Sequence, residues 1–177
     1  MTTLAATPDR GAEDGDVIDA RPAPDSGQPR WLTSAELETW LNFAQLLMRL
    51  PTALDRQLRE EAGLSLAYYQ VLAKLSDQPD RAIRMTRLAR LTGTTTTRLS
   101  HAVTALEQRG WVRRSACPSD KRGQVAELTD AGEAVLRAAA PGHVAEVRRL
   151  VLDHLTDQDL THLHDVTAKL LPAVTDR

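Results

Sequence analysis

The stretch from Arg87 to Thr129, RLARLTGTTTTRLSHAVTALEQRGWVRRSACPSDKRGQVAELT, decides the fold of this 177-residue chain. Apolar residues recur at helical spacing on both sides of Gly93, and after Gly110 the apolar period changes from 3.6 to 2. The pattern predicts a short helix over residues 86–92, a turn at Gly93 and a second helix over about residues 95–109. Two strands, WVRRSA and GQVAEL, should follow as a hairpin whose tip is CPSDKR.

Two short helices around a glycine turn, followed by a hairpin, form a winged helix-turn-helix. In that arrangement the second helix enters the major groove of DNA, and the hairpin, or wing, reaches the neighbouring backbone or the minor groove. We therefore predict a mainly α fold with a small β-hairpin wing, in which a winged helix-turn-helix is joined to dimerisation helices.

The other helices are predicted from capping residues and from apolar residues at helical spacing. The first helix begins after Thr33 and includes Pro51, which should kink it or split it in two. A long helix should run to about His154 with an interruption at PGH, residues 141–143, and AIRM allows at most one small strand. The residues predicted to cap helices are Thr33, Ser65, Thr86, Thr95, Thr129 and Thr156.

These elements divide the chain into four predicted segments. Residues 1–30 have almost no large apolar side chains, so we expect a disordered tail. A dimerisation helix is expected in residues 31–64, the winged helix-turn-helix in 65–129, and further dimerisation helices in 130–177. The flanking helices carry apolar stripes beyond what the winged helix needs, which favours packing against a second copy. A bundle formed within one chain is the alternative.

The basic residues are gathered in one part of the chain. Residues 81–122 contain ten Arg or Lys and two acidic residues, a net charge of +8, whereas the whole chain carries −2. The remainder must therefore carry −10. Such an asymmetry indicates a nucleic-acid-binding surface rather than a generally charged one.

The four threonines at 94–97 fit the start of a DNA-reading helix. Four β-branched residues disfavour a helix interior, but at an N-terminus their hydroxyls cap the helix and can bond phosphates or base edges. With Leu99 and Val103 buried, 100° steps place one set of side chains away from the core: Thr94, Thr97, Arg98, His101 and Thr104. We predict that DNA is contacted by Thr94, Thr95, Thr97, Arg98 and His101, with Thr95 a cap that touches phosphate. A solvated helix face with structural caps is the alternative.

The wing tip, PSDKRG, has a charge pattern suited to DNA. An arginine at a hairpin tip suits the narrow, electronegative minor groove, and a neighbouring acid is tolerated there if it orients that arginine. We interpret Asp120 as the orienting acid, Arg122 as the inserted cation and Lys121 as a phosphate contact. An exposed charged turn is the alternative. Further phosphate-contact candidates are Arg84, Arg113 and Arg114.

The same stretch resembles the DNA-binding core of the MarR family, the multiple antibiotic resistance regulators. The resemblance rests on LARLTGTTTTRLSHAVTALEQRGWVRR, the wing DKR and the following LTDAG, and extends over roughly residues 34–171. It implies an obligate dimer that binds pseudo-palindromic DNA and is controlled by a small ligand or by oxidation. It also places Asp120 and Arg122 on the family's wing pair and Arg98 on the basic residue of its recognition helix.

The resemblance further implies an effector pocket between the DNA-binding core and the dimerisation helices. Trp40, Phe43 and Tyr68 could stack on an aromatic acid while Arg49 pairs with its carboxylate, although such residues more often pack in cores or interfaces. Cys117 is the only cysteine and suggests redox sensing as an alternative. No cofactor and no metal site is expected, since the five histidines lack convincing ligand partners.

Together these features predict a cytoplasmic, non-enzymatic transcriptional regulator with no membrane segment. It should act as a homodimeric repressor of sequence-specific type, relieved by a small aromatic acid or drug-like ligand. Two alternatives remain at this point: a non-catalytic winged-helix module that binds proteins, and a cysteine-based redox-sensing regulator. Steep salt dependence of binding would favour the DNA-binding interpretation.

Overall fold

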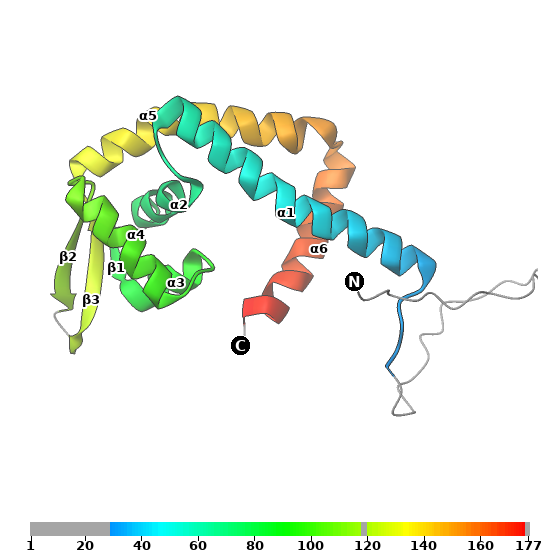
Figure 1. Cartoon of the computed structure of the whole chain (residues 1–177), viewed down its shortest axis with the longest axis horizontal. Coiled ribbons are helices and arrows are strands. Elements are labelled where there is room, and N and C mark those ends of the chain that lie inside the picture. The colour runs from blue at the N-terminus through cyan, green and yellow to red at the C-terminus, as the bar shows by residue number, and fades with distance from the viewer. Residues whose placement is uncertain (1–28, 118–119, 176–177) are drawn as a thin grey trace, which may run out of the picture. The chain divides into compact units, whose positions relative to one another are not determined.

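The computed structural model describes residues 29–117 and 120–175, except for the side chains of residues 117 and 120–122. The tail predicted for residues 1–30 lies outside this range except for its last two residues. The described residues up to Met48 form one compact unit, and those from Arg49 onward form a second. The elements shown in Figure 1 are α1 (Ser34–Ala62), α2 (Leu66–Ser76), β1 (Ala82–Arg84), α3 (Met85–Leu91), α4 (Thr96–Gln108), β2 (Val112–Cys117), β3 (Asp120–Leu128), α5 (Asp130–Leu150), a 3-10 turn (Leu152–His154) and α6 (Asp157–Thr175).

The fold confirms the prediction of a mainly helical protein with a small β-hairpin wing. Helices α3 and α4 enclose the turn at Gly93, whose φ of 62° lies in the left-handed region that glycine tolerates. Strands β2 and β3 form the predicted hairpin. The AIRM segment adds β1 to it as a third antiparallel strand, in the order β1-β3-β2.

The α1 helix begins as the sequence predicts. The Thr33 hydroxyl accepts a hydrogen bond from the Glu36 backbone N–H, and the Glu36 carboxylate accepts one from the Thr33 backbone N–H at 2.9 Å. The second of these bonds is the main cause of a lowered pKa at Glu36. Pro51 does not split the helix, which is continuous from Ser34 to Ala62. One proline removes only one hydrogen bond of a 29-residue helix.

An aliphatic core holds the second unit together. Its largest fully buried side chains come from every helix of the winged domain and from the end of α1. Asp55, on α1, accepts hydrogen bonds from the Leu66 backbone N–H at 2.8 Å and from Arg59 Nε at 2.6 Å, which joins α1 to the start of α2. The core leucines and valine are Leu58, Leu64, Leu72, Leu75, Leu88, Leu99, Leu106 and Val103.

The predicted interruption of the long helix at PGH is wrong. Helix α5 runs without a break from Asp130 to Leu150 and includes residues 141–143. An added Cβ at Gly142 would lie 2.4 Å from Glu61 Oε2 and 3.1 Å from Gln57 Nε2, so α1 passes close to α5 there. The packing of α5 against α1 at this point compensates for the hydrogen bond lost at Pro141. The α-helix ends at Leu150, before the predicted end, and the 3-10 turn follows.

A second correction concerns the start of α3. Thr86 was predicted to cap this helix, but α3 begins one residue earlier, at Met85. Arg84 is the N-cap residue and makes no side-chain capping hydrogen bond. Because β1 ends at Arg84, the strand leads directly into the helix, and Thr86 lies within its first turn.

Helix α6 begins at the predicted cap but leaves its apolar stripe uncovered in a single chain. The Asp159 backbone N–H donates to the Thr156 hydroxyl at 3.3 Å, and the Thr156 backbone N–H donates to the Asp159 carboxylate at 3.0 Å. No residue of α6 is buried. The exposed apolar side chains on this helix are Leu163, Val166, Leu170, Leu171 and Val174.

No helix in the described part of the chain is both long and apolar enough to cross a membrane.

The half-buried imidazole of His143 should make folding stability depend on pH. Burial lowers the pKa of His143 below its usual 6.5, its ring lies 4.3 Å from that of Tyr69, and its Nδ1 is buried without a hydrogen-bond partner among the described residues. The unfolded chain therefore binds a proton near its usual pKa, while the native chain does not. Stability should be complete above about pH 6.5 and fall as the pH drops below that value.

We expect His143→Gln to flatten this pH dependence, because glutamine does not titrate. Urea denaturation of both proteins at pH 7.5, 6.5 and 5.5 measures the effect. A difference in unfolding free energy between the two proteins that is constant over this range would contradict the assignment.

Candidate nucleic-acid interface

The entry of α4 is built from threonines, as the sequence predicts. Thr95 has extended backbone angles, and its hydroxyl accepts a hydrogen bond from the Arg98 backbone N–H at 3.2 Å. The Thr94 backbone N–H bonds the Ala89 carbonyl at 3.0 Å, which fixes the turn between the two helices. Thr95 is therefore the N-cap of α4, and Thr96 and Thr97 lie in its first turn, where backbone N–H groups have no acceptor within the helix.

The faces of α4 also follow the prediction. Leu99, Val103 and Leu106 are buried, whereas the opposite side of the helix is exposed. The exposed side chains there are Thr97, Arg98, His101 and Thr104, and Thr94 is half-buried. The helix thus presents hydroxyl, guanidinium and imidazole groups, which can donate to or accept from base edges and phosphates.

A hollow lies beside this face and was not predicted from the sequence. Its volume is about 350 Å³, and it is formed by the start of α3, the first turns of α4 and strand β3. Thr86, Ser100 and Gln124 supply hydroxyl and amide groups to it. No motif in the sequence indicates this hollow, because its three walls are brought together only by folding. The residues that line it are Arg84, Met85, Thr86, Thr96, Ser100, Gly123 and Gln124.

The wing residues lie at the start of β3. The backbone of Asp120, Lys121 and Arg122 belongs to this strand, and a bulge occurs between Ala116 and Cys117 on the facing strand. The side chains of Cys117, Asp120, Lys121 and Arg122 lie outside the described residues. The predicted ion pair, the predicted insertion of Arg122 and the redox role of Cys117 therefore stay predictions.

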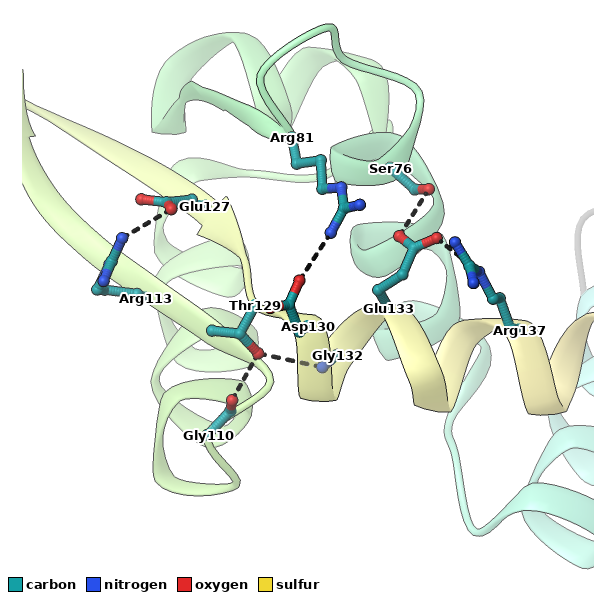
Figure 2. A network of polar contacts seen from close by, with 10 residues as sticks. All are labelled: Ser76, Arg81, Gly110, Arg113, Glu127, Thr129, Asp130, Gly132, Glu133 and Arg137. Carbon is teal, nitrogen blue, oxygen red and sulfur yellow. Dashed lines mark hydrogen bonds and ion pairs between the residues drawn. The ribbon is translucent and has the colours of Figure 1, made fainter.

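Two neighbouring arginines on β2 lie in different surroundings. Arg113 is exposed and pairs with Glu127 on β3 at 2.7 Å, an interaction that raises the pKa of the arginine (Figure 2). Arg114 instead faces α4, where Glu107 binds it at 2.5 Å. Both arginines were predicted from the sequence as phosphate contacts, since spacing alone does not indicate which face of a strand meets a helix.

A network of polar contacts joins the winged domain to the start of α5 (Figure 2). The Thr129 hydroxyl donates to the Gly110 carbonyl at 2.7 Å and accepts from the Gly132 backbone N–H at 3.1 Å. Arg81 pairs with Asp130 at 3.1 Å. The Ser76 hydroxyl donates to Glu133. These contacts fix the direction in which α5 leaves the DNA-reading domain.

The four residues predicted to bind an effector fall into two groups. Trp40 and Phe43 are on the first unit, with ring centroids 6.5 Å apart. Arg49 and Tyr68 belong to the second unit. The Arg109 guanidinium lies 5.1 Å from the centre of the Tyr68 ring and 5.2 Å from that of Trp111, so one face of Tyr68 is already covered.

In the described part of the chain, no group of three His, Cys, Asp or Glu side chains is placed to hold a metal ion.

Comparison with known proteins agrees with this architecture. The family model described as MarR family matches residues 62–123. Transcriptional regulator HosA of Escherichia coli O111:H- is 32% identical over 99 residues, which cover 56% of this chain and 72% of HosA.

Two solved structures are more similar still. Sco3205, a MarR family transcriptional regulator from Streptomyces coelicolor solved in complex with DNA, has 47% identity and a TM-score of 0.79, covering 84% of this chain and 92% of that one. AbsC, a MarR family regulator from the same organism, has 36% identity and a TM-score of 0.79, covering 84% of this chain and all of that one. The chain therefore belongs to the MarR family of transcriptional regulators.

Proposed function

We propose that this regulator is a homodimeric repressor that binds a pseudo-palindromic DNA operator and is released by a small ligand. The observation that carries the proposal is the exposed face of α4, where Thr97, Arg98 and His101 stand opposite a buried aliphatic face. The relative Sco3205 was solved in complex with DNA, which supports the same role for this helix here. We further propose that the protein acts by binding, without catalysis, in the cytoplasm.

The charge of the described surface supports contact with the DNA backbone. Exposed arginines come from β1, α3, α4 and β2, the same elements that surround the recognition helix. Backbone N–H groups at the start of α4 add a favourable field for phosphate. The exposed arginines on these elements are Arg84, Arg87, Arg90, Arg98 and Arg113.

Dimerisation is supported by the uncovered apolar stripe of α6. Leu163 and Val166 are 40% and 50% exposed in one chain, and Leu170 extends the same stripe. Such a stripe is expected to pack on a second copy around a two-fold axis. A two-fold dimer places its two recognition helices about one DNA turn apart, roughly 34–36 Å, which matches two half-sites.

Control by a ligand follows from this geometry. A ligand that binds better to a dimer with the wrong spacing of its reading heads lowers the affinity for DNA through that difference. We propose an aromatic acid or similar molecule as the effector, bound with the help of Trp40, Phe43, Arg49 and Tyr68. Oxidation of Cys117 is the competing signal.

The experiment that tests the proposal is a titration of the purified protein against fragments of the DNA that flanks its own gene, at 50 and 200 mM salt. Tight binding to one palindromic fragment, with affinity falling by a log–log slope of about −0.9 per phosphate contacted, is expected. Weak binding that does not distinguish the fragments, or binding that is insensitive to salt, would contradict a repressor acting on its own promoter. Binding of a protein partner would then be the function to examine.

His101→Ala should change which DNA sequence is preferred. Its imidazole lies on the exposed face of α4, one turn after Thr97, where it can reach a base edge. Loss of one base contact should cost about 1–3 kcal/mol at the contacted base pair and little elsewhere. Selection from a randomised operator library measures this preference. An equal loss of affinity for all sequences would mean that His101 only contacts the backbone.

A further inference from the structure

The least exposed of the ion pairs described at the DNA-binding surface joins the wing to the recognition helix. The Arg114 side chain is 18% exposed and its partner Glu107 is 31% exposed, whereas the side chain of the neighbouring Arg113 is 67% exposed. Successive residues of a strand point to opposite faces, so Arg113 and Arg114 lie on different faces of β2. Only Arg114 faces α4.

Arg114 binds α4 through every nitrogen of its guanidinium. Its Nε donates to Glu107 Oε2 at 2.5 Å, Nη1 donates to Ser100 Oγ at 3.4 Å, and Nη2 donates to Thr104 Oγ1. The backbone N–H of Arg114 also donates to Glu107 Oε1 at 2.9 Å. The three acceptors lie along two turns of α4. The planar guanidinium therefore fixes both the distance and the rotation of the helix relative to the strand.

This arrangement leaves little of Arg114 for DNA. Three of its five guanidinium N–H groups donate to α4, and moving the guanidinium to a phosphate would require breaking the contacts with Glu107. The connection between α4 and β2 is short, with the Trp111 backbone N–H bonded to the Leu106 carbonyl at 3.0 Å. The two elements thus meet at the chain connection and again at the Arg114 contacts, so neither can rotate independently of the other.

We propose that Glu107 and Arg114 are positioning residues for DNA recognition, which hold the wing strand at the angle that lets it and α4 contact one operator together. The inference rests on the proposed function, because it concerns how the same interface reads DNA. In this role an acidic residue favours the binding of a polyanion. Neutralising it should therefore lower the affinity for DNA, the opposite of the effect expected from charge alone.

The decisive variant is Glu107→Gln. Removing a negative charge near DNA should strengthen binding if electrostatics alone operated. If Glu107 positions Arg114, the variant should instead weaken operator binding by about 10-fold, the size of one misplaced base-edge contact. Arg114→Gln should cause a similar loss. In this positioning role Arg114 contacts no phosphate, so the salt slope of Arg114→Gln should differ from that of wild type by less than half of the roughly 0.9 expected for one lost phosphate contact.

Two further variants complete the experiment. Glu127→Gln is the matched control, since it removes the same charge from the partner of the neighbouring β2 arginine, the exposed Arg113, without touching α4. The operator affinity of this variant should stay equal to wild type or rise. The double variant Glu107→Gln/Arg114→Gln should bind about as well as either single variant, because the two residues act as a unit. Binding of each variant is measured on the DNA fragment that wild type prefers, at two salt concentrations. Every measurement is made at least about 15 °C below the melting temperature of that variant. The fraction of each protein that is active in DNA binding is titrated.

The outcomes distinguish a failure of the proposed function from a failure of the positioning role. If wild type prefers no fragment, the proposed function fails, and the positioning role fails with it. If wild type binds its operator but Glu107→Gln binds equally or more tightly, the positioning role is wrong while the proposed function stands. A lowered melting temperature with unchanged affinity of the folded protein would show a purely structural pair. A salt slope reduced by about 0.9 in Arg114→Gln would show a phosphate contact instead.

Discussion

Gly132→Ala should destabilise the protein by about 3 kcal/mol, at the upper end of what overpacking usually costs. An added Cβ would lie 2.1 Å from the Trp111 carbonyl oxygen and 2.8 Å from a methyl carbon of Leu128. The Trp111 carbonyl oxygen also accepts a hydrogen bond from the Thr129 backbone N–H at 3.1 Å. It cannot move away without breaking this bond to the N-cap residue of α5. For a chain of this size the melting temperature should fall by roughly 6–12 °C, measured by circular dichroism.

Gly142→Ala is the matched control for this prediction. It is a second glycine in the interior of α5, and its added Cβ would meet the end of the exposed, flexible Glu61 side chain at 2.4 Å. Turning that carboxylate away breaks its hydrogen bond from Gln57 Nε2, a loss of about 0.5–1.5 kcal/mol. The better helix propensity of alanine, about 0.5–1 kcal/mol, offsets this loss. The variant should therefore stay within about 1 kcal/mol of wild type. Equal losses in the two variants would mean that the approach of α5 to Trp111 is not the constraint.

The other large effect concerns the proposed dimer. Val166→Glu places a carboxylate on the exposed apolar stripe of α6, and a two-fold interface would contain this change twice. Burying an unpaired charge costs several kcal/mol, so the dimer dissociation constant should rise by about 100-fold or more. Operator affinity should fall by about 10²–10⁴, because each monomer then binds one half-site without the benefit of the second. Sedimentation velocity and a DNA titration measure the two effects.

Ala168→Glu provides the comparison. Ala168 is exposed on the same helix but about 165° away from the centre of the stripe formed by Leu163, Val166 and Leu170, at 100° per residue. The Ala168→Glu variant adds the same charge to α6, two residues away from Val166. We expect a dimer with DNA affinity reduced only by the added negative charge. Dissociation by both variants, or by neither, would show that the apolar stripe of α6 is not the interface.

Much of the candidate site was predictable because its signals are local. The Thr95 cap depends on a hydroxyl and a backbone N–H three residues away, and the exposed face of α4 depends on the apolar spacing of Leu99, Val103 and Leu106. The same holds for the caps at Thr33 and Thr156. Thr86 did not follow this rule, since the pairing of β1 with β3 carries an extended strand directly into α3.

The parts that could not be predicted depend on contacts between residues distant in the sequence. Whether PGH breaks α5 was decided by the close approach of Gln57 and Glu61 to Gly142, more than eighty residues along the chain. The hollow of about 350 Å³ likewise needs α3, α4 and β3 to meet. Neither the approach nor the hollow leaves a periodic or spaced pattern in the sequence.

The sequence by itself determined the order of helices and strands, every predicted cap except Thr86, and the face of α4 that meets DNA in the proposed complex. Each of these follows from hydrogen bonds and side-chain directions within a few residues, which spacing encodes. Only the tertiary structure decided that Arg113 is exposed while Arg114 is held by Glu107, and that α5 continues through Pro141. These outcomes depend on which surfaces pack together in three dimensions, where a contact formed across the fold outweighs a local preference.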